Sequence, residues 1–365
     1  MFTNDLVSQN ISGHEPYVPG KQPQLNDQTI KLNTNENPYP PSPLISDGLQ
    51  EHIDNLRLYP DSSCEQLRNS IAQLHNLDPN EVIIGNGSDD ILNLCTRCFS
   101  DVSKSIGFFE PSYSLYNVLG SLQGCPVKKI PFQNNTFEIK NDLVLESKTN
   151  LFFVTSPHAP SGRTYENSLF SSILKNYRGI LVIDEAYADF ASTNAINLLK
   201  ESEKLIIIRT LSKSYSLAGL RVGYGLGSKK IISVLNRARE VYNVDRIAQY
   251  IARVALDDRD YFSETKAKII NSREKLYSQF KDWGWDTYKS GANFLFTRPV
   301  DKNGNTGKNI AQSLFNFLQH NQIFTRYFPA HILTEPYLRI SIGKEREMDM
   351  LVTKLIQWQN KDLQV

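Results

Sequence analysis

The segment LIIIRTLSKSYSLAGLR, residues 205–221, joins a short aliphatic run to a loop that carries a lysine and an arginine. The run Leu205–Ile208 is typical of a buried strand. Lys213 lies among hydroxyl-bearing residues just past this strand, and Arg221 follows later in the same loop. Lysines in loops are usually solvated, but a lysine at a strand end is also what an imine-forming nucleophile requires. The neighbouring segments decide between these interpretations.

The same pattern, a short apolar run followed by a polar loop, recurs along the middle of the chain. Helical patterns separate the runs, which predicts an α/β fold: a largely parallel sheet with helices on both faces. Ligands bind beyond the carboxyl ends of the strands in such sheets, so the polar residues of these loops are expected to converge. The predicted strands are 81–84, 106–109, 151–154, 180–183 and 205–208.

After about residue 257 the alternation of short apolar runs and helical patterns ends, and this change predicts a second, smaller lobe. At 365 residues the chain is long enough for two lobes. We expect a large domain over residues 41–256 and a small α+β domain over 257–365, to which the N-terminal segment 1–40 belongs. The expected elements of the small domain are a long charged helix, strands near 294–296, 323–326 and 338–342, a helix near 307–320 and a C-terminal helix.

Composition excludes some classes of partner. Lys and Arg total 40 and Asp and Glu total 39, so no global field favours nucleic acid or an anionic membrane. Residues 1–10 show no basic segment leading into an apolar stretch, and no aliphatic run is long enough to span a membrane, so we expect a cytoplasmic protein. Cys95 and Cys98 form a CxxC without a second pair, which favours buried structural thiols over a metal site. Few cysteines fit a reducing compartment.

The stretch GNGSDD, residues 85–90, joins a predicted strand to a predicted helix. Its glycines allow close backbone approach, and a helix start presents free N–H groups to an anion. Taken alone, the stretch is better explained as a glycine turn with an Asp cap. It is not a Walker loop, because no Gly-Lys-Ser/Thr follows.

The stretch IDEAY, residues 183–187, places Asp184 at the tip of a hydrophobic strand. An NTPase Asp-Glu box would need a phosphate loop upstream, and none is present. A carboxylate in this position is costly unless it meets a cationic partner, for which a protonated heteroaromatic nitrogen is suitable. A nitrogen partner, a phosphate seat and an imine-forming lysine at successive strand ends together describe pyridoxal phosphate.

With these segments in place, the sequence resembles the fold-type I aminotransferases, and more closely the histidinol-phosphate aminotransferases. The resemblance covers nearly the whole chain, and its lysine-to-arginine block is the most specific part. It implies a homodimeric enzyme of histidine biosynthesis that uses pyridoxal phosphate to move an amino group between histidinol phosphate and 2-oxoglutarate. The motifs that carry it are PYVPGK (16–21), NENPYP (35–40), LYPD (58–61), GSDD (87–90), PSYSLY (111–116), DEAY (184–187), TLSKSYSLAGLR (210–221), RYF (326–328) and LRISIG (338–343).

The resemblance also implies roles for individual residues toward the cofactor. Lys213 looks like the Schiff-base lysine and later general base. Asp184 would keep the ring nitrogen protonated, Tyr187 would bond the ring hydroxyl, and Tyr113 would stack on the ring. The residues implied to hold the phosphate are Ser88 and Asp89 through their backbone amides, Thr210, Ser212, Arg221, and Tyr59 from the neighbouring subunit.

The residues expected to bind the substrates follow from the fact that one site must bind two different substrates in turn. Histidinol phosphate carries a phosphate and no carboxylate, whereas glutamate carries two carboxylates, and a guanidinium fits either anion. Arg339 is the implied shared anchor, with Arg326 assisting, although without the resemblance both would be interpreted as surface residues of a strand. Tyr17 and Asn35 match positions that line the substrate side.

The loop TSPHAPSG, residues 155–162, departs from the pattern of the family. Relatives carry an asparagine that donates to the ring hydroxyl where this chain has Ala159. His158 could substitute, but adjacent residues on an extended loop tend to point apart. We therefore expect Tyr187 to carry the ring-hydroxyl contact largely alone, helped by water or by His158.

Alternative functions share the cofactor residues and differ on the substrate side. They are an aromatic amino-acid aminotransferase and a decarboxylase of a phosphorylated amino acid. A third alternative is a non-enzymatic descendant of the fold. Ala159 gives that alternative slight support, whereas the presence of Lys213, Asp184, Tyr187 and Arg221 argues against it.

Overall fold

The computed structural model describes residues 6–14, 16–17, 20–24, 26, 28–133 and 136–360. Residues 1–5 and two positions of PYVPGK, Val18 and Pro19, lie outside the described residues. None of the helices in the described part is both long enough and apolar enough to cross a membrane.

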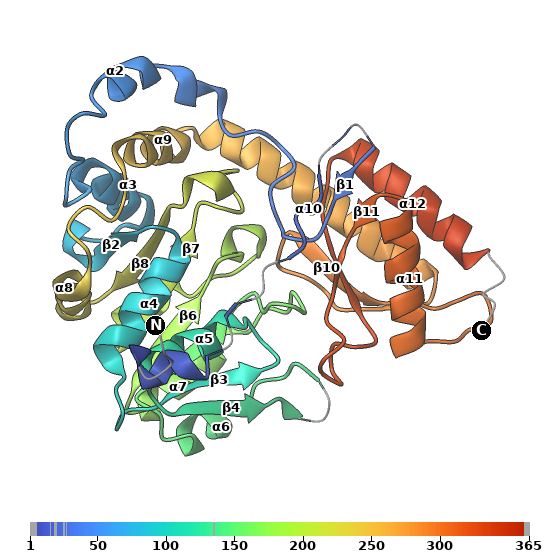
Figure 1. The fold of residues 1–365 in the computed structure, drawn as a ribbon, viewed down its shortest axis with the longest axis horizontal. Coiled ribbons are helices and arrows are strands. Elements are labelled where there is room, and N and C mark those ends of the chain that lie inside the picture. The colour runs from blue at the N-terminus through green and yellow to red at the C-terminus, as the bar shows by residue number, and fades with distance from the viewer. Residues whose placement is uncertain are drawn as a thin grey trace.

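A seven-stranded sheet forms the centre of the larger part of the molecule (Figure 1). Its order is β2-β8-β7-β6-β5-β3-β4, and every strand except β8 runs in the same direction, so the predicted α/β fold with a mainly parallel sheet is confirmed. Two strands, β4 at the edge of the sheet and the antiparallel β8, were not predicted. The strands are β2 Val82–Gly85, β3 Ile106–Glu110, β4 Val127–Pro131, β5 Leu151–Thr155, β6 Ile180–Asp184, β7 Leu205–Thr210 and β8 Gly223–Gly227.

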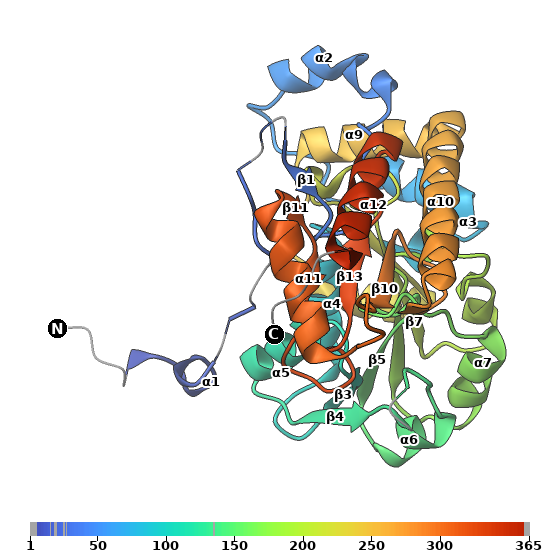
Figure 2. The same ribbon diagram turned by 90° about the vertical axis from the view of Figure 1, so that its right-hand side faces the viewer.

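Helices cover both faces of this sheet because its strands are apolar on both sides. Successive strand residues point to opposite faces. Leu205 and Ile207 of β7 accordingly join the core under α3, α7 and α9, whereas Ile206 and Ile208 join the core under α4, α5 and α8. The helices of this part are α2 Leu49–Asp54, α3 Glu65–His75, α4 Ser88–Phe99, α5 Leu115–Gln123, α6 Asn141–Glu146, α7 Asn167–Asn176, α8 Lys229–Ala238 and α9 Arg246–Asp257, and α1 Gln9–Ser12 lies on the N-terminal segment beside α5 (Figure 2).

A second core lies around a small antiparallel sheet of order β12-β13-β10-β9. The predicted strand near 323–326 is in fact two short strands, because β11 pairs with β1 and β12 pairs with β13. The N-terminal segment thereby adds β1 to this part of the molecule. The elements are β1 Ile30–Lys31, β9 Asp286–Thr287, β10 Phe294–Arg298, β11 Ile323–Phe324, β12 Arg326–Tyr327, β13 Leu338–Ser341, α10 Arg259–Asp282, α11 Lys308–His320 and α12 Glu345–Gln359.

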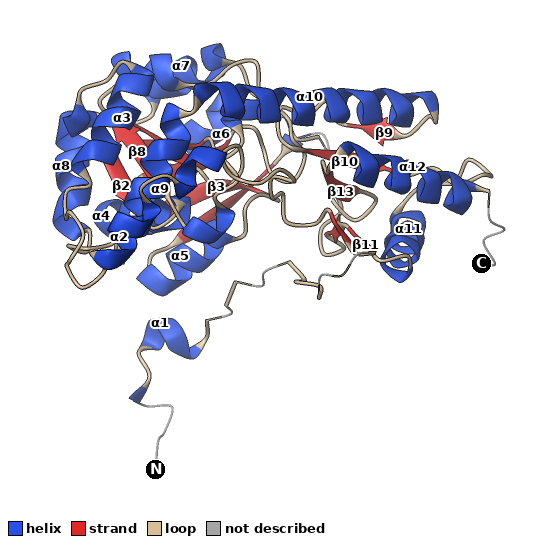
Figure 3. Ribbon diagram, turned by 90° about the horizontal axis from the view of Figure 1, so that it is seen from above, coloured by secondary structure: helices blue, strands red, loops and turns tan. Residues whose placement is uncertain are grey.

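Helix α10 joins the two cores (Figures 1 and 3). Phe262 in its first turn packs into the core of the large sheet, whereas Ile269, Leu276 and Phe280 pack into the core of the small sheet. The predicted domain boundary at residue 257 falls just before this helix. Short 3₁₀ helices span Pro43–Ser46, Pro79–Glu81, Ala188–Phe190, Ile196–Lys200 and Ala218–Leu220.

Candidate active site

A cavity of about 880 Å³ opens beyond the carboxyl ends of the parallel strands, between the large sheet and β12 and β13. All the residues that the sequence nominates line it, with the exception of Tyr59. Tyr59 is 77% exposed and stacks on Tyr242 at 4.6 Å between ring centroids, on a surface outside the cavity. One chain by itself therefore assembles the whole nominated set apart from the residue expected to act across a subunit interface.

The start of α4 and Arg221 form one corner of the cavity. Gly87, with φ of +82°, caps the helix, and a Cβ at this position would lie 2.5 Å from an Arg221 Nη atom. A Cβ on Gly223 would lie 2.3 Å from the Ser88 amide. Arg221 also donates to Ser212 Oγ at 3.4 Å. The two glycines thus let helix N–H groups, a guanidinium and a hydroxyl converge, which is the donor set of an anion seat.

The Asp89 side chain has a different role from its backbone amide. Its carboxylate pairs with Arg221 at 3.3 Å and accepts a hydrogen bond from Tyr113 at 3.1 Å. Thr210, which the resemblance assigns to the phosphate, donates to Ser212 Oγ at 2.9 Å and accepts from the Ser212 amide at 3.1 Å. These contacts hold the Tyr113 ring and the Ser212 hydroxyl at the corner.

Asp184 ends β6 at the floor of the cavity and is buried. Its Oδ2 accepts from the Tyr116 hydroxyl at 2.8 Å and its Oδ1 accepts from the Ala186 amide at 3.2 Å. Burial raises the pKa of the Asp184 carboxyl to about 6, and the two hydrogen bonds oppose this rise. The carboxylate is therefore held in place, and it forms no ion pair with a cation among the residues that the structure describes.

We expect Asp184→Asn to stabilise the cofactor-free protein by about 1–3 kcal/mol at pH 8. The folded-state pKa of about 6 lies above the ordinary value of 3.8, so the buried charge costs stability above pH 6 and the cost disappears as the pH falls toward 4. An asparagine can accept from the Ala186 amide and donate to Tyr116. Urea unfolding at pH 8 and pH 4 would measure this, with exposed Asp349→Asn as control. A less stable variant at pH 8 would contradict it.

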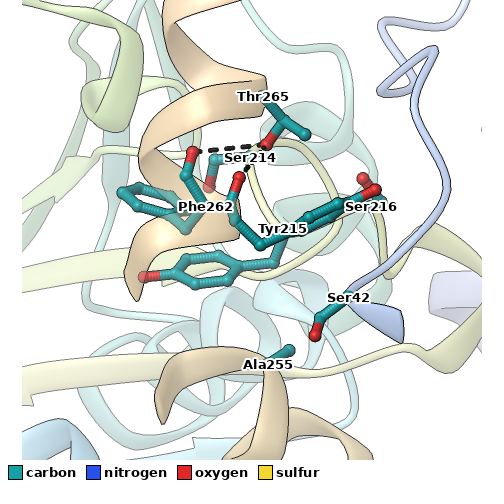
Figure 4. Close-up of a pocket in the computed structure, with 8 residues that line it drawn as sticks. Ser42, Ser214, Tyr215, Ser216, Ala255, Phe262 and Thr265 are labelled. Atoms are coloured by element: carbon teal, nitrogen blue, oxygen red, sulfur yellow. Dashed lines mark hydrogen bonds between the residues drawn. The ribbon is translucent and has the colours of Figure 1, made fainter. Parts of the chain in front are cut away.

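Lys213 extends from the loop after β7 into the cavity, where its Nζ donates to the Thr34 carbonyl at 3.1 Å. Two contacts outside the cavity hold this loop in place. Ser214 Oγ donates to Asp189 Oδ2 at 2.5 Å, and Tyr215 stacks on Phe262 of α10 at 4.4 Å. A residual space of about 10 Å³ between this loop, α9 and α10 has room for about one water molecule (Figure 4). The loop therefore has little freedom to move the lysine.

Burial and, to a smaller extent, the positive charge of Arg339 together lower the pKa of the Lys213 ammonium to about 8, while Glu36 opposes the change. Glu36 lines the cavity and is itself paired with Lys31 and Thr34. An amine with this pKa is substantially neutral near pH 8 and can act as a nucleophile.

Competitive labelling of the cofactor-free protein with acetic anhydride should show Lys213 reacting with a midpoint near pH 8. The reference for comparison is a free lysine side chain in a model peptide, whose pKa is about 10.4. Arg339→Gln should move the Lys213 midpoint upward, because it removes a neighbouring positive charge. A Lys213 midpoint equal to that of the free lysine side chain would contradict the inference.

Tyr187 and Asn35 meet on the side of the cavity that faces the small sheet. Asn35 Nδ2 donates to the Tyr187 hydroxyl at 2.9 Å, and Asn35 Oδ1 accepts from Ser341 Oγ at 2.8 Å. Asn293 donates to the Asn35 carbonyl at 2.9 Å, which holds Asn35 in a left-handed backbone conformation with φ of +57°. With its oxygen already accepting one hydrogen bond, Tyr187 is oriented to donate its own proton into the cavity.

Arg326 and Arg339 lie directly opposite each other on β12 and β13. Arg339 donates to the Asn33 carbonyl at 3.0 Å, and its Nε is buried without a partner among the described residues. Burial lowers the pKa of Arg339, and no carboxylate of the described chain forms an ion pair with it. Tyr17 also lines this end of the cavity. The arrangement is a second seat for an anion, separate from the corner formed by Arg221.

The TSPHAPSG loop turns His158 away from the cavity. Its Nδ1 lies 2.8 Å from Ser161 Oγ and its Nε2 lies 3.1 Å from the Pro111 carbonyl, and burial lowers its pKa to about 3. Ala159 instead faces the cavity and packs with Tyr187. His158 is therefore a structural residue of the turn and does not reach the position that Ala159 leaves without a donor.

Sequence reasoning missed Tyr116, Thr155 and Glu36. Tyr116 lies in the quoted motif PSYSLY, one helical turn after Tyr113, and this spacing could have indicated that both rings face the same strand ends. Thr155 ends β5, where polar residues were expected to converge. Glu36 lies in the motif NENPYP and could have been found by the same argument.

Comparison with known proteins identifies the class to which this site belongs. A family model described as aminotransferase class I and II matches residues 27–355. The chain is 38% identical to the histidinol-phosphate aminotransferase of Microcystis aeruginosa over 353 residues, which cover 97% of each chain. It therefore belongs to the histidinol-phosphate aminotransferase family, and it is a pyridoxal phosphate-dependent aminotransferase.

Solved structures share the fold. The histidinol-phosphate aminotransferase of Sinorhizobium meliloti, in complex with pyridoxal-5′-phosphate, superimposes with a TM-score of 0.82 at 23% identity, covering 91% of this chain and 90% of that one. The enzyme from Clostridium acetobutylicum gives the same TM-score and identity and covers 91% and 99%. This likeness identifies the architecture as fold-type I.

The residues of the cavity fit pyridoxal phosphate. The corner formed by Ser88, Ser212 and Arg221 supplies donors for a phosphate, and its two glycines leave the space that a Cβ would fill. Asp184 is a buried carboxylate that forms no ion pair among the described residues, and Lys213 is an amine of lowered pKa in the same cavity. These groups would hold the phosphate, the ring nitrogen and the aldehyde carbon of the cofactor, respectively.

Proposed function

We propose that this protein transfers an amino group between histidinol phosphate and 2-oxoglutarate, as a step of histidine biosynthesis. The observation that carries the proposal is the Arg326–Arg339 pair, a second anion seat in the cavity that also contains the Arg221 corner. One seat suits the phosphate of the cofactor and leaves the other for the phosphate or carboxylate of a substrate. The identity to histidinol-phosphate aminotransferases supports the same assignment.

Each side chain would have one task around the bound cofactor. Pyridoxal phosphate supplies an electron sink that stabilises negative charge on the carbon next to the amino group. Asp184 would keep a proton on the ring nitrogen, and Tyr187 would donate its proton to the ring hydroxyl. Lys213 Nζ would carry a proton between two carbon atoms as a general base and acid. Arg339 would orient the anionic end of the substrate.

The two substrates share an anionic end but differ in its shape and charge. A guanidinium offers parallel N–H donors that match either a phosphate or a carboxylate, which an ammonium group does not. Arg339 lines the cavity, and its Nε has no hydrogen-bond partner among the described residues, so its guanidinium keeps a donor for an anion. We therefore expect one guanidinium to serve both anions in turn.

A half-reaction titration tests the proposal. Cofactor-loaded protein is mixed with one equivalent of histidinol phosphate, phenylalanine or O-phosphothreonine, and the absorbance of the cofactor is followed. We expect histidinol phosphate to convert the cofactor to its amine form, and 2-oxoglutarate to restore it. Preference for phenylalanine would indicate an aromatic aminotransferase, and CO₂ release from O-phosphothreonine a decarboxylase. No conversion by any donor would favour a non-catalytic protein.

We also propose that the protein is a homodimer and lies in the cytoplasm. Tyr59 stacks on Tyr242, and the residues next to them in the chain, Leu58 and Val241, are also large hydrophobic side chains exposed to solvent. Exposed hydrophobic side chains that gather in this way are typical of an interface. The cytoplasmic location is supported by the four cysteines, each a free thiol.

We expect light scattering to give twice the mass of one chain. If Tyr59 reaches the phosphate of the partner's cofactor, Tyr59→Phe should weaken binding of pyridoxal phosphate about tenfold, because a hydrogen bond to a charged group is lost. Tyr242→Phe in the same ring stack is the matched control and should leave binding unchanged. A monomer that retains full affinity for the cofactor would contradict this proposal.

A further inference from the structure

Tyr116 is a buried side chain at the start of α5 whose hydroxyl has two side-chain partners. It lies 2.8 Å from Asp184 Oδ2 and 2.7 Å from Thr155 Oγ1. An ionised carboxylate can only accept, so Tyr116 donates to Asp184 and therefore accepts from Thr155. Ser112 Oγ lies a further 3.3 Å from Thr155 Oγ1. The contacts form a chain of hydroxyls that ends at the carboxylate.

The ring of Tyr116 cannot leave this position easily. It stacks on Phe153 at 4.8 Å with an interplanar angle of 5°. The ring centroids of Phe108, which is tilted by 54°, and of Tyr113, which is edge-on, each lie 5.7 Å away. The residue has no exposed surface and does not line the cavity, whereas Ser112 and Thr155 do. Its hydroxyl consequently contacts Asp184 on the side away from the cavity and leaves the side of the carboxylate that faces the cavity open.

The surroundings of Asp184 make this hydrogen bond important. The Ala186 amide and Tyr116 favour the ionised carboxylate, whereas burial and the negative charges of Asp89 and Glu185 disfavour it. Glu185 is largely neutralised by Arg209, whose Nη2 lies 2.7 Å from it. Around the cavity, the hydroxyls of Tyr113 and Tyr187 are the other titratable groups near Asp184, and both are neutral at physiological pH because burial raises their pKa.

We propose that Tyr116 is a positioning residue for the cofactor: its hydroxyl, held by Thr155, fixes Asp184 and keeps it ionised so that the carboxylate holds a protonated ring nitrogen. The inference rests on the use of pyridoxal phosphate and not on the identity of the amino donor. Tyr116 acts through Asp184 and does not touch the cofactor. Its effect should therefore be confined to cofactors that have a ring nitrogen.

The test compares two cofactors in cofactor-free Tyr116→Phe. One is pyridoxal phosphate, and the other is its 1-deaza analogue, in which a C–H replaces the ring nitrogen. We expect the variant to bind pyridoxal phosphate about tenfold more weakly, as for a lost hydrogen bond to a charged group, and to bind the analogue as the wild type does. Tyr177→Phe is the matched control, since Tyr177 is a buried tyrosine bonded to Thr149 at the other end of β5.

A spectroscopic readout separates positioning from packing. In protein loaded with ¹⁵N-labelled cofactor, the ¹⁵N shift of the ring nitrogen of Tyr116→Phe should move toward the value of an unprotonated ring at neutral pH, because an Asp184 carboxylate that has lost a hydrogen-bond donor is more basic and takes a larger share of the proton. Thr155→Val should shift it in the same direction by less, and provides the second variant if Tyr116→Phe folds poorly. Equal weakening of both cofactors, or an unchanged ¹⁵N shift of the ring nitrogen, would overturn the proposal. Neither measurement uses a substrate, so failure of the histidinol phosphate assignment would leave both results interpretable.

Discussion

Lys213→Ala is expected to lower kcat by about 10⁴-fold or more. The substitution removes the amine that would both hold the cofactor and move the proton, and general acid–base catalysis alone contributes about 10²–10⁴-fold. Among the described residues that line the cavity, the other lysine is Lys129, and it is paired with Glu110 at 3.0 Å. The loss should be measured as single-turnover conversion of the loaded cofactor by histidinol phosphate.

Lys129→Ala is the matched control and should change the rate by less than about threefold, since exposed ion pairs of this kind contribute little. The Lys213 variant should fold normally, because it loses a buried amine whose pKa is lowered by burial. Retention of more than about 1% of the wild-type rate by Lys213→Ala would contradict the assignment.

Arg339→Gln is expected to lower kcat/KM about 30- to 5,000-fold for histidinol phosphate and for glutamate alike. Truncating one partner of a buried, hydrogen-bonded charge pair costs about 2–5 kcal/mol, and each 1.4 kcal/mol is about tenfold. The effect should fall on both substrates because one guanidinium serves both anions. Steady-state kinetics in each direction would measure it.

Arg298→Gln is the control for this variant. Arg298 lies at the end of the neighbouring strand β10, is 40% exposed and pairs with Asp286 at 3.1 Å, so its loss should change kcat/KM less than about twofold. Loss of activity toward only one substrate in Arg339→Gln would mean that the two anions use separate anchors, with Arg326 as the candidate for the second.

The strand positions of the large sheet could be predicted because they rest on a local property. A strand buried on both faces, such as β5 or β6, is a continuous apolar run that the chain itself displays. Strand β4 could not be predicted in this way, because its sequence, VKKIP, is largely exposed. Strand β8 could not be predicted either. Its sequence, GYGLG, has few apolar side chains, and its antiparallel direction depends on how the loop 211–222 returns the chain to the sheet.

The site was predictable where a residue's position along a strand decides its location. Asp184 and Lys213 follow strands of one parallel sheet, so both had to lie near its carboxyl edge. The direction of a side chain within a loop was not predictable. His158 and Ala159 are neighbours, yet the first bonds to Ser161 and Pro111 while the second faces Tyr187.

The sequence by itself determined the five buried parallel strands β2, β3, β5, β6 and β7 and the polar residues at their ends, because both depend on short runs of neighbouring residues. Only the tertiary structure decided the contacts between distant segments. Asn35 reaches Tyr187, Tyr116 reaches Asp184, and the register of β12 on β13 pairs Arg326 with Arg339. Such contacts depend on how elements pack against one another, and packing is a property of the whole core that no single segment contains.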